Sequence, residues 1–160
     1  MIAIERILVA HDFSETSAEA VTYGVALARQ FGAALHVLHV GEHVRFEMDM
    51  EFPLGLDGMT DATRERLLKI LAPADQAALA PHLVVRAGQP AAEIVSYASE
   101  AGIDLIVMGT HGRGLVGHVV MGSVAEAVVR TAPCPVLTVR HRAQPLESAV
   151  DVRVHAGATA

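Results

Sequence analysis

The residues of this chain best suited to bind a ligand form a glycine-rich stretch that ends at Ser123. The chain has 13 glycines, and five of them fall in this stretch: Gly109, Gly112, Gly114, Gly117 and Gly122. Glycines this dense let the backbone turn sharply and approach a ligand closely, whereas one or two would suffice for a tight turn alone. Arg113 adds a positive charge, and no Asp or Glu occurs from residue 109 to residue 125. These features favour the binding of a phosphate group.

The elements expected on either side strengthen that interpretation. Residues 103–108 are mostly apolar and predict a buried strand, and residues 123–131 predict a helix. A glycine loop that ends at a helix N-terminus presents unpaired N–H groups and the positive end of the helix dipole to an anion. We expect Ser123 both to cap this helix and to donate to a phosphate through its hydroxyl. For Arg113 we favour a phosphate contact over simple exposure to solvent.

Two familiar phosphate-binding motifs do not fit the stretch. It lacks the Gly-Lys-Ser/Thr of a Walker loop. Residues 112–117 satisfy Gly-x-Gly-x-x-Gly. A dinucleotide-binding fingerprint, however, follows the first strand of a βαβ unit, and an acidic residue that binds the ribose comes about 20 residues later. Here the stretch follows the fourth expected strand, and the next expected strand, 136–140, carries no acid. A dinucleotide site is therefore not expected.

The chain as a whole predicts one α/β domain in which strands and helices alternate. Strands are expected at 2–10, 34–40, 82–87, 103–108 and 136–140, and helices at 16–31, 61–72, 90–101 and 123–131. This alternation predicts a doubly wound parallel sheet with helices on both faces, and right-handed crossovers restrict its topology. We expect five strands in the order 3-2-1-4-5. Ligands bind such sheets where the winding reverses, so the exit of the first strand should face the glycine-rich stretch.

Asp12 lies in that exit loop, and two roles are open to it. It either faces the crevice as a ligand-binding residue or serves as the entry cap of the next helix, a common role for Asp after a strand. The helix itself is expected to begin with a capping box, in which Thr16 is the cap and Glu19 follows three residues later.

Two segments fall outside the regular alternation. Residues 41–60 mix Met, Phe, Pro and acids, and we interpret them as an excursion beside the site that serves as a lid. After residue 140 the chain turns polar, although residues 149–155 still alternate between apolar and polar. We therefore expect a domain over 1–141 and a C-terminal tail over 142–160, which is either an extra edge strand or disordered.

The composition narrows the classes of partner. The net charge of −6 argues against general nucleic-acid binding, because no basic stripe is available. No stretch is long enough to span a bilayer, the N-terminus does not resemble a signal peptide, and the single cysteine fits a reducing compartment, so we expect a cytoplasmic protein. The spacing of His11, His111 and His118 does not match a zinc site, and no metal site is expected.

The spacing of the glycines resembles the nucleotide-binding loop of the universal stress protein family. From Gly109 to Ser123 the chain follows the pattern Gly-x2-Gly-x9-Gly-Ser. The resemblance covers residues 2–140 and includes three shorter matches: Asp12-Phe13-Ser14, His39-Val40 and Pro133-Cys134-Pro135-Val136. The chain departs from the family's usual pattern at Ala10, where many members have Pro, and at His11, which is bulkier and more basic than is usual.

This resemblance implies a flavodoxin-like fold that binds ATP, with Mg²⁺ accompanying the phosphates but no dedicated set of protein ligands for it. Asp12 would lie beside the nucleoside, and the main chain of Val40 would meet the adenine edge. The residues expected around the ribose and phosphates are Gly109, Gly112, Gly122 and Ser123, with the Val124 amide at the helix start. The resemblance also implies a homodimer that pairs its last strands.

The function implied is that of an ATP-binding module in stress response or signalling. Neither a general base nor a partner to orient one is evident, so no catalytic residue is assigned, and slow ATP hydrolysis or self-phosphorylation is left open. One alternative is a family member that binds no nucleotide, against which the intact glycine pattern argues. The other is an adenine-nucleotide hydrolase of the wider fold group, for which the chain offers no second domain to hold a substrate.

Overall fold

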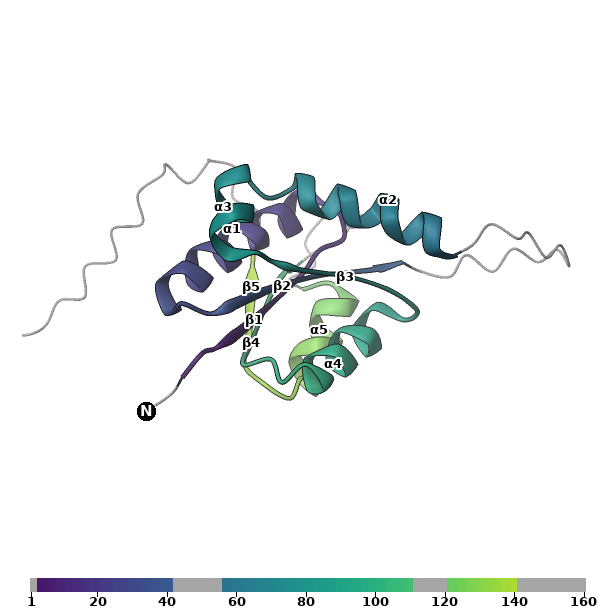
Figure 1. Ribbon diagram of the computed structural model, residues 1–160. Helices are drawn as coiled ribbons and strands as arrows, with labels where there is room; N and C mark the ends of the chain where they lie inside the picture. The colour runs from purple at the N-terminus through teal and green to yellow at the C-terminus, as the bar shows by residue number, and fades with distance from the viewer. Residues whose placement is uncertain (1–2, 42–55, 111–120, 141–160) are drawn as a thin grey trace, which may run out of the picture.

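The computed structural model describes residues 3–41, 56–110 and 121–140 (Figure 1). The strands in these ranges are β1 (Arg6–Ala10), β2 (Ala34–Gly41), β3 (His82–Ala87), β4 (Leu105–Gly109) and β5 (Val136–Val139). The helices are α1 (Glu15–Phe31), α2 (Leu56–Lys69), α3 (Pro73–Leu79), α4 (Pro90–Glu100) and α5 (Ser123–Thr131). None of these helices combines the length and the apolar character that crossing a membrane requires.

All neighbouring strands are parallel, and their order is β3-β2-β1-β4-β5. This confirms the predicted doubly wound sheet. β1 and β4 lie side by side at its centre, with Ala10 of β1 level with Met108 of β4. From β1 the chain proceeds to β2 on one side, and from β4 it proceeds to β5 on the other. The winding therefore reverses between the two central strands, where ligands bind in sheets of this kind.

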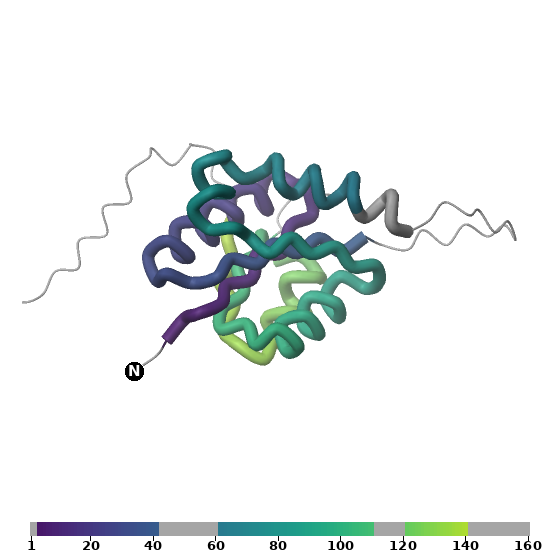
Figure 2. Tube along the Cα trace, viewed as in Figure 1, coloured from purple at the N-terminus to yellow at the C-terminus, as the bar shows by residue number. Residues whose placement is uncertain are grey.

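Each face of the sheet has its own helices and its own core. α1, α2 and α3 cover one face, and α4 and α5 cover the other (Figures 1 and 2). Ile7 and Val9 of β1 pack with Val107 of β4 in the core under α1. Leu8 packs with Ile106 in the core under α4 and α5. Both sides of the central strands are buried, which explains why their sequences are almost wholly apolar.

A close contact fixes the position of α1 above the sheet. Gly24 lies in the middle of this helix, and a Cβ atom there would overlap Cγ2 of Val9 in β1. The lack of a side chain lets the helix approach the strand.

The start of α1 differs from the prediction, and its end agrees with it. The helix begins at Glu15 with Ser14 as its N-cap, so the expected capping box at Thr16 is wrong. Thr16 is instead buried, and the Ser14 hydroxyl accepts a hydrogen bond from the main-chain N–H of Ser17. Gly32, at φ 64°, ends the helix in the left-handed conformation that glycine adopts readily.

The segment between β2 and β3 also differs in its boundaries. α2 begins at Leu56 rather than at residue 61, so the irregular stretch expected over 41–60 is shorter than predicted. α2 includes Gly58, because a helix tolerates one glycine at a cost of about 1 kcal/mol. α2 ends at Lys69 rather than at residue 72, and Pro73 starts α3, as its fixed φ and missing N–H allow at a first helical position. The proposed lid over 42–55 and the tail over 142–160 lie outside the described residues.

Candidate anion-binding site at the winding reversal

The crevice between β1 and β4 is bordered by three of the stretches that the sequence singled out. The exit loop of β1 carries Asp12, β4 ends at Gly109, and α5 begins at Ser123. Ala10 and Met108 form the last paired position of the two strands, and beyond it the two chains diverge. The sheet topology therefore brings together residues that lie far apart in the sequence.

Asp12 supports the start of α1 without being its cap. Its Oδ1 accepts hydrogen bonds from the main-chain N–H of Ser14, at 3.0 Å, and from the Ser14 hydroxyl, at 2.5 Å. Ser14 in turn accepts from the N–H of Ser17 at 3.2 Å. Burial raises the pKa of Asp12, but hydrogen bonds with Ser14 and Ser17 and the nearby His11 outweigh it, so its pKa lies below the ordinary value. Asp12 is therefore a stable negative charge at the crevice edge.

The main chain of Val40 borders the same crevice. The N–H of His11 donates to the carbonyl of Leu38 at 2.9 Å, which shows that the polar main-chain groups of Leu38 face β1. Alternate residues of a strand direct their main-chain groups to the same side, so those of Val40 also face β1. Because β1 ends at Ala10, the main-chain N–H and C=O groups of Val40 have no partner among the described strands on that side and face the crevice.

The glycine-rich stretch is closed at its base by main-chain hydrogen bonds. Thr110 donates to the carbonyl of Val139 at 2.8 Å, and Gly122 donates to the carbonyl of Thr110 at 2.6 Å. The stretch therefore leaves β4 and enters α5 at a single point. Residues 111–120 lie outside the described part of the chain, and with them Gly112, Arg113 and Gly114.

Gly109 has a packing role that sequence reasoning missed. A Cβ atom at this position would lie 2.9 Å from Cγ2 of Thr16 and 3.1 Å from its carbonyl carbon. The end of β4 therefore approaches the first turn of α1 too closely for any side chain. Local sequence carried no signal of this contact, because the two residues meet only through the sheet topology.

α5 begins with main-chain N–H groups that have no partner within the helix. Its N-cap is Gly122, at φ −73° and ψ 155°, so no side chain caps the helix, and the expected cap role of Ser123 is wrong. Ser123 is instead the first helical residue and is exposed. The first bond of the helix runs from the N–H of Glu126 to the carbonyl of Gly122, at 2.9 Å. The N–H groups of Ser123, Val124 and Ala125 precede that bond and lack an acceptor within the helix.

This arrangement has the chemistry of an anion site. Three main-chain donors lie at the positive end of the α5 dipole, and anions bind helix N-termini for this reason. Within the described ranges, no three His, Cys, Asp or Glu side chains gather closely enough to hold a metal ion.

The comparisons with known proteins agree with this fold. The universal stress protein family matches residues 3–140. The universal stress protein MJ0531 of Methanocaldococcus jannaschii is 33% identical over 139 residues, which cover 85% of this chain and 82% of that protein. The universal stress protein UspA of Lactobacillus plantarum has a TM-score of 0.71 at 29% identity, covering 86% of this chain and 99% of that one.

A third protein of the same fold is a universal stress protein solved in complex with cAMP. It has a TM-score of 0.61 at 24% identity, covering 86% of this chain and 98% of that one, a level that shows the fold alone. The family match over residues 3–140, together with the sheet order, gives the assignment. The chain belongs to the universal stress protein family.

Proposed function

We propose that this universal stress protein binds ATP in the crevice between β1 and β4 and acts as a nucleotide-dependent module in stress response or signalling. The observation that carries the proposal is the start of α5, where the N–H groups of Ser123, Val124 and Ala125 precede the first helical hydrogen bond. A triphosphate satisfies such donors and interacts favourably with the helix dipole.

The remaining site residues are assigned from the family resemblance. In this proposal Asp12 lies beside the nucleoside, and the main chain of Val40 meets the adenine edge. Gly109 ends β4 against Thr16 of α1, and we assign its backbone, with that of Gly122, to the ribose and phosphates. From the glycine-rich stretch we assign Gly112, Arg113 and Gly114 to the phosphates, and Mg²⁺ to the phosphates as a companion ion.

Relatives lend this proposal chemical support. The same fold holds cAMP in one universal stress protein and dAMP in another. Both ligands combine an adenine base with a phosphate, which are the two groups that the Val40 edge and the α5 start are suited to bind. The triphosphate of ATP adds charge at the α5 end.

We propose a binding protein rather than a dedicated catalyst. The carboxylate of Asp12 is occupied by Ser14, and its lowered pKa makes it a poor proton acceptor. We further propose a cytoplasmic location and a homodimer through β5, an edge strand whose Leu137 is 37% exposed. Replacement of Leu137 by Asp should then yield monomers in sedimentation experiments.

Calorimetric titration of the full chain with ATP and Mg²⁺ tests the proposal. We expect saturable binding at submillimolar ATP, weaker binding of adenosine and weaker binding of tripolyphosphate, because each carries only one of the two recognised groups. Phosphate release measured in parallel separates binding from hydrolysis. Absence of binding at several millimolar ATP would contradict the proposal and favour the branch of the family that binds no nucleotide.

A further inference from the structure

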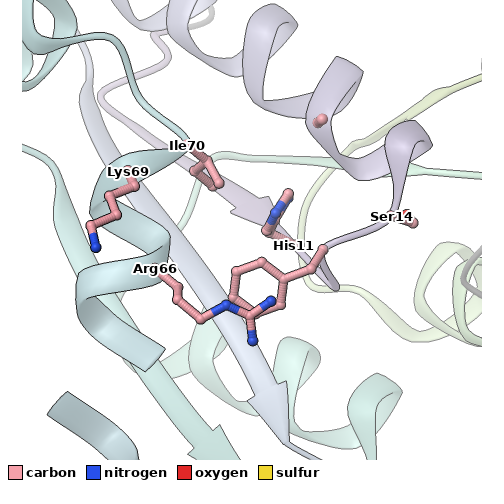
Figure 3. Close-up of a pocket in the computed structure, with 7 residues that line it drawn as sticks. His11, Ser14, Arg66, Lys69 and Ile70 are labelled. Atoms are coloured by element: carbon pink, nitrogen blue, oxygen red, sulfur yellow. The ribbon is translucent and has the colours of Figure 1, made fainter. Parts of the chain in front are cut away.

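A second pocket opens beside the crevice, on the face of the sheet covered by α1 and α2. Its volume is about 410 Å³, within the usual range for small-molecule sites. Figure 3 shows Arg66 and Lys69 of α2, with Ile70 just after the helix, on one side and His11 and Ser14 of the β1 exit on the other. The pocket therefore lies between a strand exit and a helix that are distant in the sequence.

An aromatic cluster forms one wall of this pocket. Phe13 has φ 63°, a left-handed backbone conformation that non-glycine residues rarely adopt. Its ring centroid lies 5.0 Å from that of His11 and 4.7 Å from that of His39. The guanidinium carbon of Arg66 lies 4.0 Å from the Phe13 centroid, a distance typical of cation–π contacts. The contact holds the Arg66 charge at the pocket while leaving its N–H groups available.

The charge of the pocket is positive in a chain whose net charge is −6. Its lining includes the cations Arg66 and Lys69, and no carboxylate occurs among the residues that the structure places there. Elsewhere in the described ranges, Arg29, Arg64, Arg86 and Arg130 form ion pairs with acids, whereas Arg66 and Lys69 form none with any described residue. Two cations without a carboxylate partner therefore meet at one concave surface.

The pocket also offers apolar surface and lies apart from the nucleotide crevice. Phe13, Ala18 and Ile70 supply the apolar part of its lining. It shares only the exit loop of β1 with the crevice, and α2 contributes no residue to the proposed ATP site. The side chain of Val40, beside the crevice, packs into the core of the opposite face.

We propose that this pocket binds a small amphipathic anion, a carboxylate or phosphate carried on an aromatic or short aliphatic body, at a site separate from the nucleotide. The apolar body packs against Phe13, Ala18 and Ile70. The anionic group pairs with Arg66 and Lys69, whose charges no described acid neutralises. This second ligand goes beyond the proposed ATP binding and does not depend on it.

Amide chemical-shift titrations of the full chain with benzoate and with phenyl phosphate test this inference. We expect saturable shifts at Phe13, Ala18 and Ile70, and the tighter of the two probes identifies the preferred anionic group. The Arg66→Gln/Lys69→Gln variant should bind roughly tenfold more weakly or worse, because two charge-assisted contacts are lost. The Arg64→Gln/Arg130→Gln variant removes the same total charge from other exposed positions and should bind both probes as the parent chain does.

Two further arms make the test decisive. Benzyl alcohol, which lacks the anionic group, should bind far more weakly than benzoate, and saturating ATP should leave the affinity for the probes unchanged. The inference is overturned if neither anion binds at millimolar concentration or if the Arg66→Gln/Lys69→Gln variant binds as well as the parent. Displacement of the probes by ATP would also overturn it, because the pocket would then be part of the nucleotide site.

Discussion

α1 and α5 both begin at the edge of the crevice, and their caps have nearly the same backbone conformation. Ser14, the cap of α1, has φ −83° and ψ 162°, and Gly122, the cap of α5, has φ −73° and ψ 155°. The difference lies in the side chain. The Ser14 hydroxyl accepts the N–H of Ser17, whereas the glycine has no group with which to close its helix.

The two helix starts also differ in the acidic residues around them. α1 has Glu15 in its first turn, and the carboxylate of Asp12 is bonded to its cap, so its positive end is already compensated. Before α5 no acid occurs from residue 109 to residue 125. Glu126 does lie in the first turn of α5, but 3.5 Å separates its Oε1 from Nη1 of Arg130. One cap residue and its neighbouring charges therefore distinguish the start of α1, which stabilises the fold, from the start of α5, which we propose binds the ligand.

The largest expected effect on ATP affinity comes from placing a negative charge at the start of α5, the helix start that no side chain caps. We predict that Ser123→Asp weakens ATP binding roughly 100-fold, because a carboxylate within a few ångströms of the phosphates repels them across a partly solvated site. The melting temperature should not fall, since an acid in the first turn favours the helix dipole. Calorimetric titration and thermal unfolding measure the two quantities.

The control for that variant is Ala26→Asp, which adds the same charge on an exposed position of α1 away from the crevice. ATP affinity within about twofold of the parent is expected. Equal losses in both variants would mean that net charge, rather than the α5 start, determines binding.

A smaller effect is predicted when only one N–H group is removed. Ser123→Pro deletes the first N–H of α5, and proline suits this position because the preceding residue is already extended. The loss of one hydrogen bond to a charged group should weaken ATP binding roughly tenfold.

Two variants sharpen this result. Glu15→Pro makes the same change at the first residue of α1 and should leave ATP affinity unchanged, because that helix start is closed by Ser14. Ser123→Ala keeps the N–H and removes only the hydroxyl. If Ser123→Ala matched the loss of Ser123→Pro, the hydroxyl and not the main chain would be the phosphate donor.

At the start of α1, which Ser14 caps, a substitution should change the stability of the fold instead of the ATP affinity. Ser14→Ala removes the cap of α1 and should lower the free energy of unfolding by about 1 kcal/mol. Ser123→Ala, at the start of α5, should change the free energy of unfolding by less than about 0.5 kcal/mol. Urea unfolding of the two variants measures both values, and equal destabilisation would contradict the distinction between the two starts.

The smallest predicted effect is a pH dependence that Asp12 contributes to α1. Its pKa is lower in the folded chain than its ordinary value, so its stabilisation is fully present above that ordinary value and is lost as the pH falls through the lowered pKa. Below about pH 4 the parent should therefore lose stability more steeply than Asp12→Asn. Urea unfolding from pH 6 downward gives the free energy of unfolding of both chains as a function of pH. Parallel curves would show that Asp12 makes no pH-dependent contribution to stability.

Periodic and local signals predicted the strands, the helices and the parallel sheet. The alternation of apolar strands with helices indicated a doubly wound sheet, whose expected order the structure confirms, and the glycine pattern located the start of α5 at Ser123. The end of α1 at residue 31 was also predicted. The positions of single elements depend on neighbours within a few residues, which a sequence displays directly.

What the sequence could not predict depends on contacts between distant segments. Gly109 is needed where β4 meets Thr16, and Arg66 lies over Phe13 only because α2 packs beside the exit of β1. The cap of α1 was misassigned because Ser14 and Thr16 are both acceptable cap residues. Burial of Thr16 against the end of β4, a tertiary effect, decided between them.

Amide proton shifts test most directly whether the main-chain N–H groups at the start of α5 bind the phosphates. On addition of ATP to the full chain, we expect downfield shifts for Ser123, Val124 and Ala125, with little change at Glu15, Thr16 and Ser17 of α1. Saturation of the chain with ATP while the three α5 amides keep their positions would contradict it.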